Sequence, residues 1–153
     1  MTSLSILPLN TGDAPTVSKL LKSDGDAYNR FFQPFPFDVD TLKKILSDIK
    51  KDKFWGIYSA DTLIGFFMLR GLDAGFDIPS YGVYVAKEYS GKGVSSLTLQ
   101  FVEVWGKLNN IQKVMIKVHP ENHTAKRIYE KSGAVAAGMD PKNANLVYFL
   151  SIR

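Results

Sequence analysis

A short glycine-containing segment between a predicted strand and a predicted helix has the residue types of an anion-binding site. Residues 81–85 alternate as a strand, and the segment Ser90-Gly91-Lys92-Gly93-Val94-Ser95 follows before a long amphipathic helix begins. Small residues let backbone N–H groups approach phosphate oxygens, and the helix dipole adds positive potential at the first turn. We therefore expect residues 90–95 to bind a phosphate-bearing ligand.

Two common nucleotide-binding motifs do not describe this segment. A P-loop requires the spacing G-x-x-x-x-G-K-[ST], which is absent here. A Rossmann fingerprint requires a third glycine where Ser96 stands, and an acidic residue about 20 positions later, where residues 113–117 are basic instead. A glycine turn that binds no ligand is the remaining structural alternative.

A second motif follows the next predicted strand, at residues 114–118. Residues 122–133 read N-H-T-A-K-R-I-Y-E-K-S-G. Asn122 is suited to the N-cap of a short helix, and Gly133 to the left-handed position after its end. This helix would carry Tyr129 on the same face as Ala125 and Ile128, so Tyr129 has either a chemical or a packing role.

Together the two segments resemble the acetyl-CoA-binding half of the GNAT acyltransferase superfamily. Its signature [RQ]-x-x-G-x-[GA] aligns with residues 90–95, and its signature N-x-x-A-x-x-[LI]-Y-x-K-x-G aligns with residues 122–133. Ser90 and Ser95 depart from the first signature. Ser90 removes a cation that normally holds the loop or the pyrophosphate, and Lys92 or Lys87 would compensate for it.

The resemblance implies one GNAT domain over residues 1–153, of the α/β (α+β) class. It implies a mixed, mostly antiparallel sheet of six or seven strands, with a splayed central parallel pair and helices on both faces. Acetyl-CoA would be the cosubstrate, with pantetheine in the gap between the parallel strands. The residues implied to bind it are Val83, Val85, Ser90, Gly91, Lys92, Gly93, Val94, Ser95, Asn122 and Lys126. For Asn122 a helix cap is sufficient, and for Lys126 a solvated helix face is the alternative.

The resemblance also implies a direct transfer from thioester to amine. Backbone amides of residues 81–85 would stabilise the oxyanion, and Tyr129 would be the general acid that protonates the leaving thiolate. Many relatives place a glutamate near the position of Ser80, where serine is no base. Asp77 is our first choice for the general base, directly or through water, and the alternatives are Asp73, Glu88 and His119.

The resemblance implies that residues 28–37 and 72–80 select the acceptor. The first segment is rich in aromatic residues and proline, and aromatic faces stack on sugars or nucleobases, although core packing accounts for part of them. Both segments resemble a GNAT subgroup associated with surface-polysaccharide and nucleotide-sugar pathways, which implies an amino-sugar acceptor. Arg30 or Arg70 would hold a diphosphate. The acceptor-binding residues that we predict are Tyr28, Phe32, Phe35, Tyr81 and His119.

The composition is that of one globular domain. The chain has 153 residues, of which 45% are hydrophobic and 22% charged, with a formal net charge of +4. The absence of cysteine excludes disulfides, thiolate metal sites and a cysteine nucleophile. His119 and His123 with scattered carboxylates give no metal-ligand pattern, so we expect no metal.

Charge and hydropathy exclude two classes of partner. Lysines and arginines are spread along the chain, whereas a nucleic-acid binder usually gathers them on one face. No apolar stretch approaches the roughly 20 residues of a membrane span, and residues 1–5 lack the features of a signal peptide. We expect a cytoplasmic protein that acts as a monomer or homodimer on a small amine.

Hydrophobic periodicity places these motifs on a strand–helix–strand unit flanked by hairpins. We expect Asp13 to cap a first helix, and Asp38 or Asp40 to begin a second. In the long helix we expect a buried stripe at Leu97, Phe101, Val104, Trp105 and Leu108. The predicted strands are residues 4–9, 54–59, 63–72, 81–85, 114–118, 135–138 and 146–152.

Two other functions fit the same motifs. One is N-acetylation of a protein or peptide, which would need an open groove rather than an aromatic-lined pocket. The other is a non-catalytic acyl-CoA-binding module, which the serines at 80 and 90 would favour.

Overall fold

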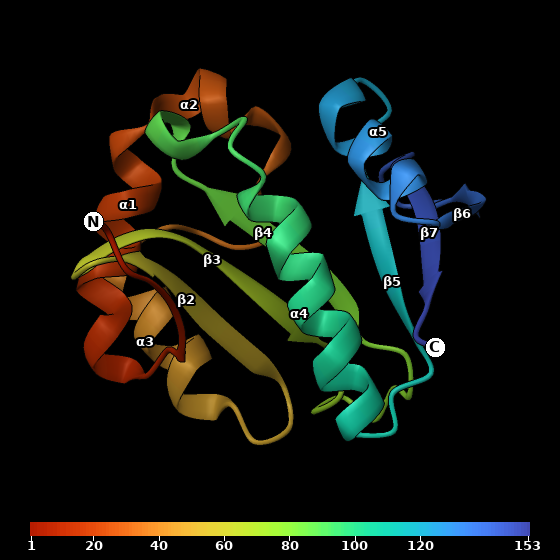
Figure 1. Ribbon diagram of the computed structural model, residues 1–153, viewed down its shortest axis with the longest axis horizontal. Coiled ribbons are helices and arrows are strands. Elements are labelled where there is room, and N and C mark those ends of the chain that lie inside the picture. Colours follow the sequence, from red (N-terminus) through yellow and green to blue (C-terminus); the bar gives the residue numbers. More distant parts are fainter.

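Seven strands form one mixed sheet in the computed structural model, which describes residues 1–153 (Figure 1). The strand order is β1-β2-β3-β4-β5-β7-β6, and every neighbouring pair is antiparallel except β4–β5. The predicted fold class is confirmed, including the central parallel pair. The strands are β1 Leu4–Pro8, β2 Lys53–Ser59, β3 Thr62–Arg70, β4 Ser80–Val85, β5 Lys113–Val118, β6 Val135–Met139 and β7 Leu146–Ser151.

Helices cover both faces of this sheet (Figure 1). On one face lie α1 (Ala14–Ser23) and α3 (Val39–Asp48), and on the other lie α4 (Val94–Leu108) and α5 (His123–Lys131). The short α2 (Gly25–Tyr28) continues into the 3-10 turn η2 (Asn29–Phe31). Two further 3-10 turns are η1 (Thr11–Asp13) and η3 (Lys87–Tyr89). None of the helices combines the length and the apolar character that a membrane span requires.

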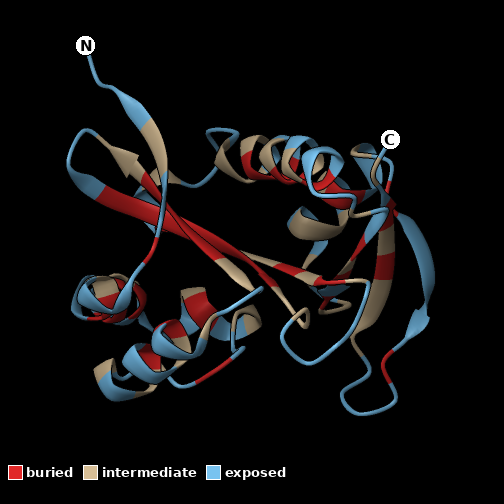
Figure 2. Cartoon of the chain, turned by 90° about the horizontal axis from the view of Figure 1, so that it is seen from below, coloured by how far each residue is buried: buried red, intermediate tan, exposed pale blue.

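The alternation of side chains along β3 separates two cores. Phe66 packs with Met68 beneath α1 and α3, whereas Phe67 packs with Leu69 beneath α4 and α5. Both phenylalanines are fully buried, because successive strand residues point to opposite faces and both faces are covered. Figure 2 shows the buried residues concentrated in the sheet and on the helix faces that cover it.

Two predictions about helices were wrong in detail. Asp13 does not cap α1 with its side chain. Its carboxylate instead accepts the backbone N–H of Asn10 at 2.8 Å, as half of a capping box that Asn10 completes. In α4, Val104 and Leu108 are exposed, and the buried positions are Thr98, Leu99, Val102 and Gly106.

Other local predictions are confirmed. Asp38 is the N-cap of α3, and its carboxylate accepts the Thr41 N–H at 2.9 Å. Asn122 caps α5 by accepting the Ala125 N–H at 3.3 Å. Gly133 follows α5 with φ 94°, a left-handed conformation in which glycine is favoured.

The parallel ladder between β4 and β5 is short, and this positions the site. Only Ser80 and Tyr81 of β4 pair with β5, opposite Met115 and Ile116, and the strands then separate (Figure 1). The carbonyl of Pro79 accepts a hydrogen bond from the Met115 N–H of β5. Along a strand, the N–H and C=O groups of every second residue point to the same edge, so those of residues 81, 83 and 85 point the same way as those of Pro79. The main-chain groups of Val83 and Val85 therefore face the gap.

Candidate active site

A cleft of about 830 Å³ occupies the gap between β4 and β5. It collects residues from β4, the loop before α4, the end of β5, α5 and the α2–η2 segment. Most of the predicted site residues line it: Tyr28, Phe32, Tyr81, Val83, Val85, Ser90, Gly91, Gly93, Val94, Ser95, His119, Asn122 and Tyr129. The structure does not place Phe35, Asp77, Lys92 or Lys126 in its lining.

The glycine loop has the backbone shape of an anion site. Gly91 and Gly93 have φ angles of 75° and 86°, and a Cβ atom added at either position would meet no atom within 4 Å. Gly93 is the N-cap of α4 and supplies no side chain, so the first-turn N–H groups are not capped from within the loop. Ser90 does not replace the missing cation, because its hydroxyl donates to the Lys87 carbonyl at 2.7 Å. The loop can therefore offer phosphate oxygens main-chain donors and the helix dipole.

Tyr129 is a buried tyrosine at the wall of the cleft. Its ring packs edge-on against the ring of Tyr81, with centroids 6.2 Å apart. Burial alone raises the pKa of the Tyr129 phenol, and no hydrogen bond to the protein contributes. The side chain is 7% exposed, and its hydroxyl is not among the fully enclosed polar atoms that lack a partner. The Tyr129 hydroxyl is therefore free to bond a ligand in the cleft.

Tyr81 was predicted to contact the acceptor, but its hydroxyl has a structural partner. It forms a 2.6 Å hydrogen bond with the Thr98 hydroxyl, which donates to the Ser95 carbonyl at 2.7 Å. This chain joins β4 to the first turn of α4, immediately beside the glycine loop. Burial raises the pKa of Tyr81 well above its ordinary value, and the Thr98 bond opposes the shift.

His119 lies at the end of β5 and faces the α2–η2 segment. Its Nδ1 atom accepts the Glu121 N–H at 3.1 Å, so the neutral imidazole carries its proton on Nε2. In that state the ring has no free lone pair for an incoming amine proton. Its ring packs against Phe31 with centroids 4.8 Å apart, and the Arg30 guanidinium lies 4.4 Å from the centre of the Phe31 ring.

The aromatic segment divides between core and cleft. Phe32 lines the cleft but also contacts Phe35, Phe37, Phe66 and Tyr84 in the core. Phe35 is 9% exposed and packs against Phe54, which explains its absence from the cleft. Arg70 lies over these same two rings, so the structure holds it against the core.

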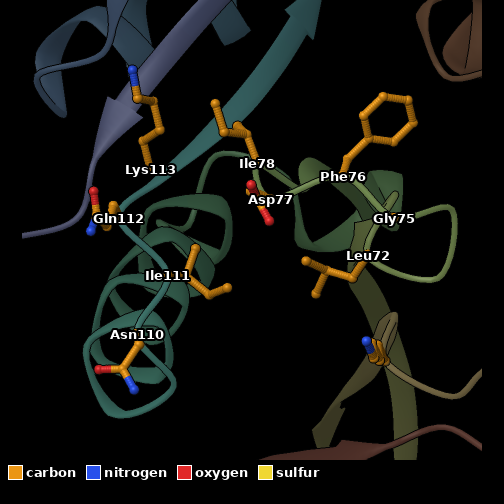
Figure 3. A pocket seen from close by; sticks show the side chains of 10 residues that line it. Leu72, Gly75, Phe76, Asp77, Ile78, Asn110, Ile111, Gln112 and Lys113 are labelled. Atoms are coloured by element: carbon orange, nitrogen blue, oxygen red, sulfur yellow. The ribbon is translucent and has the colours of Figure 1, made fainter.

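Asp77 faces a different pocket from the one that Tyr129 lines. This second pocket, of about 510 Å³, lies at the opposite end of the short parallel ladder, among residues that precede β4 and β5. Figure 3 shows Asp77 there with Leu72 and Ile111. Direct contact between Asp77 and an amine in the cleft is therefore not supported.

Asp73, the alternative carboxylate, has a structural role. It accepts the backbone N–H groups of Lys50, Lys51 and Asp52 at 3.1, 2.6 and 3.2 Å. These bonds lower the Asp73 pKa, those from Lys50 and Lys51 most. Asp73 thus joins the β3–β4 loop to the α3–β2 loop, as a turn residue would.

Sequence reasoning did not identify Asp24, a carboxylate that bonds to Tyr84 beside the cleft. It accepts the Tyr84 hydroxyl and, at 3.2 Å, the Lys87 N–H. Desolvation, followed by the hydrogen bond to Asp24, raises the Tyr84 pKa. Tyr28 packs edge-on against Tyr84 at 6.1 Å, and its hydroxyl donates to the Val85 carbonyl at 2.6 Å. These contacts span about 60 residues of sequence, and no local pattern signals them.

A split parallel pair, a glycine loop at a helix N-terminus and a tyrosine hydroxyl without a protein partner meet in one cleft. A family model described as the acetyltransferase (GNAT) domain matches residues 3–135, and the chain belongs to this family. It is an N-acetyltransferase. No curated protein matches the sequence significantly.

Solved structures with the same fold cover nearly the whole chain. One is the PaiA N-acetyltransferase from Thermoplasma acidophilum in complex with coenzyme A, 18% identical with a TM-score of 0.80, covering 97% of this chain and 99% of its own. Another is RimL, a ribosomal L7/L12 α-N-protein acetyltransferase, in complex with coenzyme A, 14% identical with a TM-score of 0.82, covering 99% and 96%. A third is the spermidine N-acetyltransferase from Vibrio cholerae in complex with CoA and spermine, 18% identical with a TM-score of 0.79, covering 97% and 95%. These likenesses show the shared fold.

Proposed function

We propose that the protein transfers an acetyl group from acetyl-CoA directly to a primary amine while both are bound. The observation that carries the proposal is the hydroxyl of Tyr129, which is free of protein partners beside a cleft that separates β4 from β5. The glycine loop at the N-terminus of α4 lies in the same cleft. Donors for phosphate and a donor for sulfur are thus present in one connected space.

The residues present fit acetyl-CoA. The first-turn N–H groups of α4 suit the diphosphate, and the space around Gly91 and Gly93 admits it. The unpaired edge at Val83 and Val85 suits the amides of an extended ligand, which would lie against β4 as a further strand. Acetyl-CoA supplies the activated acyl group. The N–H of Val83, which faces the gap, is positioned to stabilise the oxygen of that group as negative charge develops.

Tyr129 acts as a hydrogen-bond donor to the leaving sulfur. Its raised pKa keeps the phenol protonated at every pH at which the protein would be assayed. A phenol of raised pKa is a weak acid toward an exposed thiolate. However, a sulfur in the same desolvated cleft has its own thiol pKa raised, because burial penalises both anions. The two groups therefore remain matched for proton transfer.

The amine loses its proton through solvent in this proposal. Asp77 lines the other pocket, and the acceptor nitrogen of His119 is already bonded to Glu121. Glu121 is the only carboxylate in the cleft lining, and it is exposed. We therefore expect the neutral fraction of the amine to be the reactive form, with water carrying the proton away.

We propose an amino-sugar, free or nucleotide-linked, as the acceptor. Tyr28, Arg30 and Phe31 line the cleft, and a phenol hydroxyl, a guanidinium and an aromatic ring suit a ring that bears hydroxyls and an anionic group. A polyamine is the less favoured acceptor, because the cleft lining has only one carboxylate, Glu121, to balance its several positive charges. A protein N-terminus is the alternative acceptor.

The test is a panel of amines assayed with acetyl-CoA for release of free thiol. The panel contains amino-sugars, their nucleotide-linked forms, spermidine and N-terminal peptides. Thiol release that depends on an amino-sugar and yields an N-acetyl product supports the proposal. CoA binding without amine-dependent thiol release would instead indicate a non-catalytic module, and preference for a peptide would reassign the acceptor.

A further inference from the structure

The segment from Tyr28 to Phe31 bridges the gap between the separated strands. At one end, the Tyr28 hydroxyl donates to the Val85 carbonyl on β4 at 2.6 Å. At the other end, the Phe31 ring packs against His119 at the end of β5, at 4.8 Å between centroids. Arg30 covers the Phe31 ring and donates to the Ala27 carbonyl at 2.7 Å, which holds the stack in place.

The Val85 carbonyl is a specific target for this hydroxyl. It lies on the edge of β4 that faces the gap, beyond the last pair with β5, so no strand supplies it with a donor. An extended ligand with amide groups would bond to the same edge. The Tyr28 hydroxyl therefore occupies a position that the acyl carrier, acetyl-CoA, would use.

Tyr28 is held there by its surroundings. Its ring packs edge-on against Tyr84, whose hydroxyl donates to Asp24. Burial raises the pKa of the Tyr28 phenol, and the neighbouring Asp24 carboxylate adds to the shift. The Tyr28 phenol is thus neutral, and its hydroxyl can donate a hydrogen bond.

We propose that Tyr28 is a positioning residue that couples binding of the carrier to binding of the acceptor. The inference rests on the proposed function. In the free protein the Tyr28 hydroxyl satisfies the Val85 carbonyl, and an amide of the bound carrier replaces it. The released hydroxyl then turns to the acceptor, which accepts the bond. The carrier consequently binds before the acceptor, because only the carrier frees this donor.

The opposite effects of one substitution on the two ligands test this coupling. Tyr28→Phe removes the competing hydroxyl but keeps the ring and its contact with Tyr84. We expect CoA to bind about three- to tenfold more tightly by isothermal titration, the range of one intramolecular hydrogen bond. We also expect kcat/KM for the amine to fall by at least as much. Looser or unchanged CoA binding would overturn the proposal.

A matched control is Tyr89→Phe, which removes another hydroxyl from the cleft lining. Tyr89 lines the same cleft, but the Val85 carbonyl is held by Tyr28, so loss of the Tyr89 hydroxyl should not tighten CoA binding. Equal tightening in both variants would also overturn the proposal. If the wild-type protein bound no CoA, the proposed function itself would fail. CoA binding that is unaffected by Tyr28→Phe would remove only the coupling.

Initial-rate kinetics supply a second, independent measurement. Dead-end inhibition by an unreactive amine analogue should be uncompetitive toward acetyl-CoA in the wild-type protein, as ordered binding requires. In Tyr28→Phe it should become noncompetitive, because the acceptor no longer depends on release of the hydroxyl. Noncompetitive inhibition in the wild-type protein would contradict ordered binding and the role of Tyr28 with it.

Discussion

Tyr129→Phe separates chemistry from packing better than any other single change in this protein. The substitution removes only a hydroxyl and keeps the ring that packs against Tyr81 at 6.2 Å. Because that hydroxyl has no protein partner, its loss breaks no internal hydrogen bond. We expect the free energy of unfolding to change by less than about 0.5 kcal/mol.

The effect on turnover should be much larger. Loss of a general acid typically lowers the rate about 10²-fold, which corresponds to about 2.7 kcal/mol of transition-state stabilisation. We therefore expect kcat to fall by this factor while the affinity for CoA changes little. Steady-state kinetics by thiol release, together with thermal melting, would measure both quantities on the same sample.

Tyr81→Phe is the matched control for this experiment. It removes the 2.6 Å bond to Thr98 inside the core, which we expect to cost about 1 kcal/mol, or about 2–4 °C in melting temperature. Its rate should fall by less than about tenfold, since Tyr129 is retained. An unchanged kcat in Tyr129→Phe would refute the acid role. A melting temperature lowered as much as in Tyr81→Phe would assign Tyr129 to packing.

Four further predictions rest on the same geometry. Gly93→Ala should weaken CoA binding about 5- to 30-fold by titration calorimetry, because φ 86° costs a side chain about 1–2 kcal/mol, and Gly93→Asn should recover part of the loss. Asp73→Asn should lower the melting temperature more than Asp77→Asn; because the folded Asp73 pKa is depressed, this difference is present above about pH 4 and lost as pH falls below it. The rising limb of kcat/KM with pH should follow the pKa of the amine used and should persist in Asp77→Asn; its loss in that variant would restore Asp77 as the base. Because burial raises the Tyr129 pKa, no falling limb from this phenol should occur below about pH 10.

The glycine loop and the ends of α5 could be predicted from sequence because their signals are local. The glycines at 91 and 93 have the positive φ angles that only a glycine adopts readily. Asn122 lies three residues before the N–H that it caps, and Gly133 follows the helix that it ends. Such features depend on neighbours within one turn, so residue types and spacing are enough to find them.

The contacts on the proposed acceptor side could not be predicted as well, because long-range packing decides them. Nothing near Tyr28 in sequence indicates that its hydroxyl reaches Val85, 57 residues away. The choice of Asp77 assumed that the loop before β4 faces the cleft. The loop instead lies at the opposite end of the short β4–β5 ladder, where Asp77 lines the second pocket. In α4, apolar residues occur on more than one face, so periodicity selected Val104 and Leu108 although both are exposed.

The α2–η2 segment is separate in sequence from the glycine loop and α5, so recognising those two elements does not predict what residues 28–31 contact. In the proposed function, loop 90–95 and α5 bind acetyl-CoA through main-chain donors and a capped helix end. The side chain of Tyr28 contacts Tyr84 and Val85 on β4, and that of Phe31 contacts His119 just after β5. A change in these two residues would alter the acceptor space while leaving the glycine loop intact. Substrate choice in this protein should therefore be changed by substitutions at residues 28–31, with the affinity for CoA showing whether the two halves are coupled through Val85.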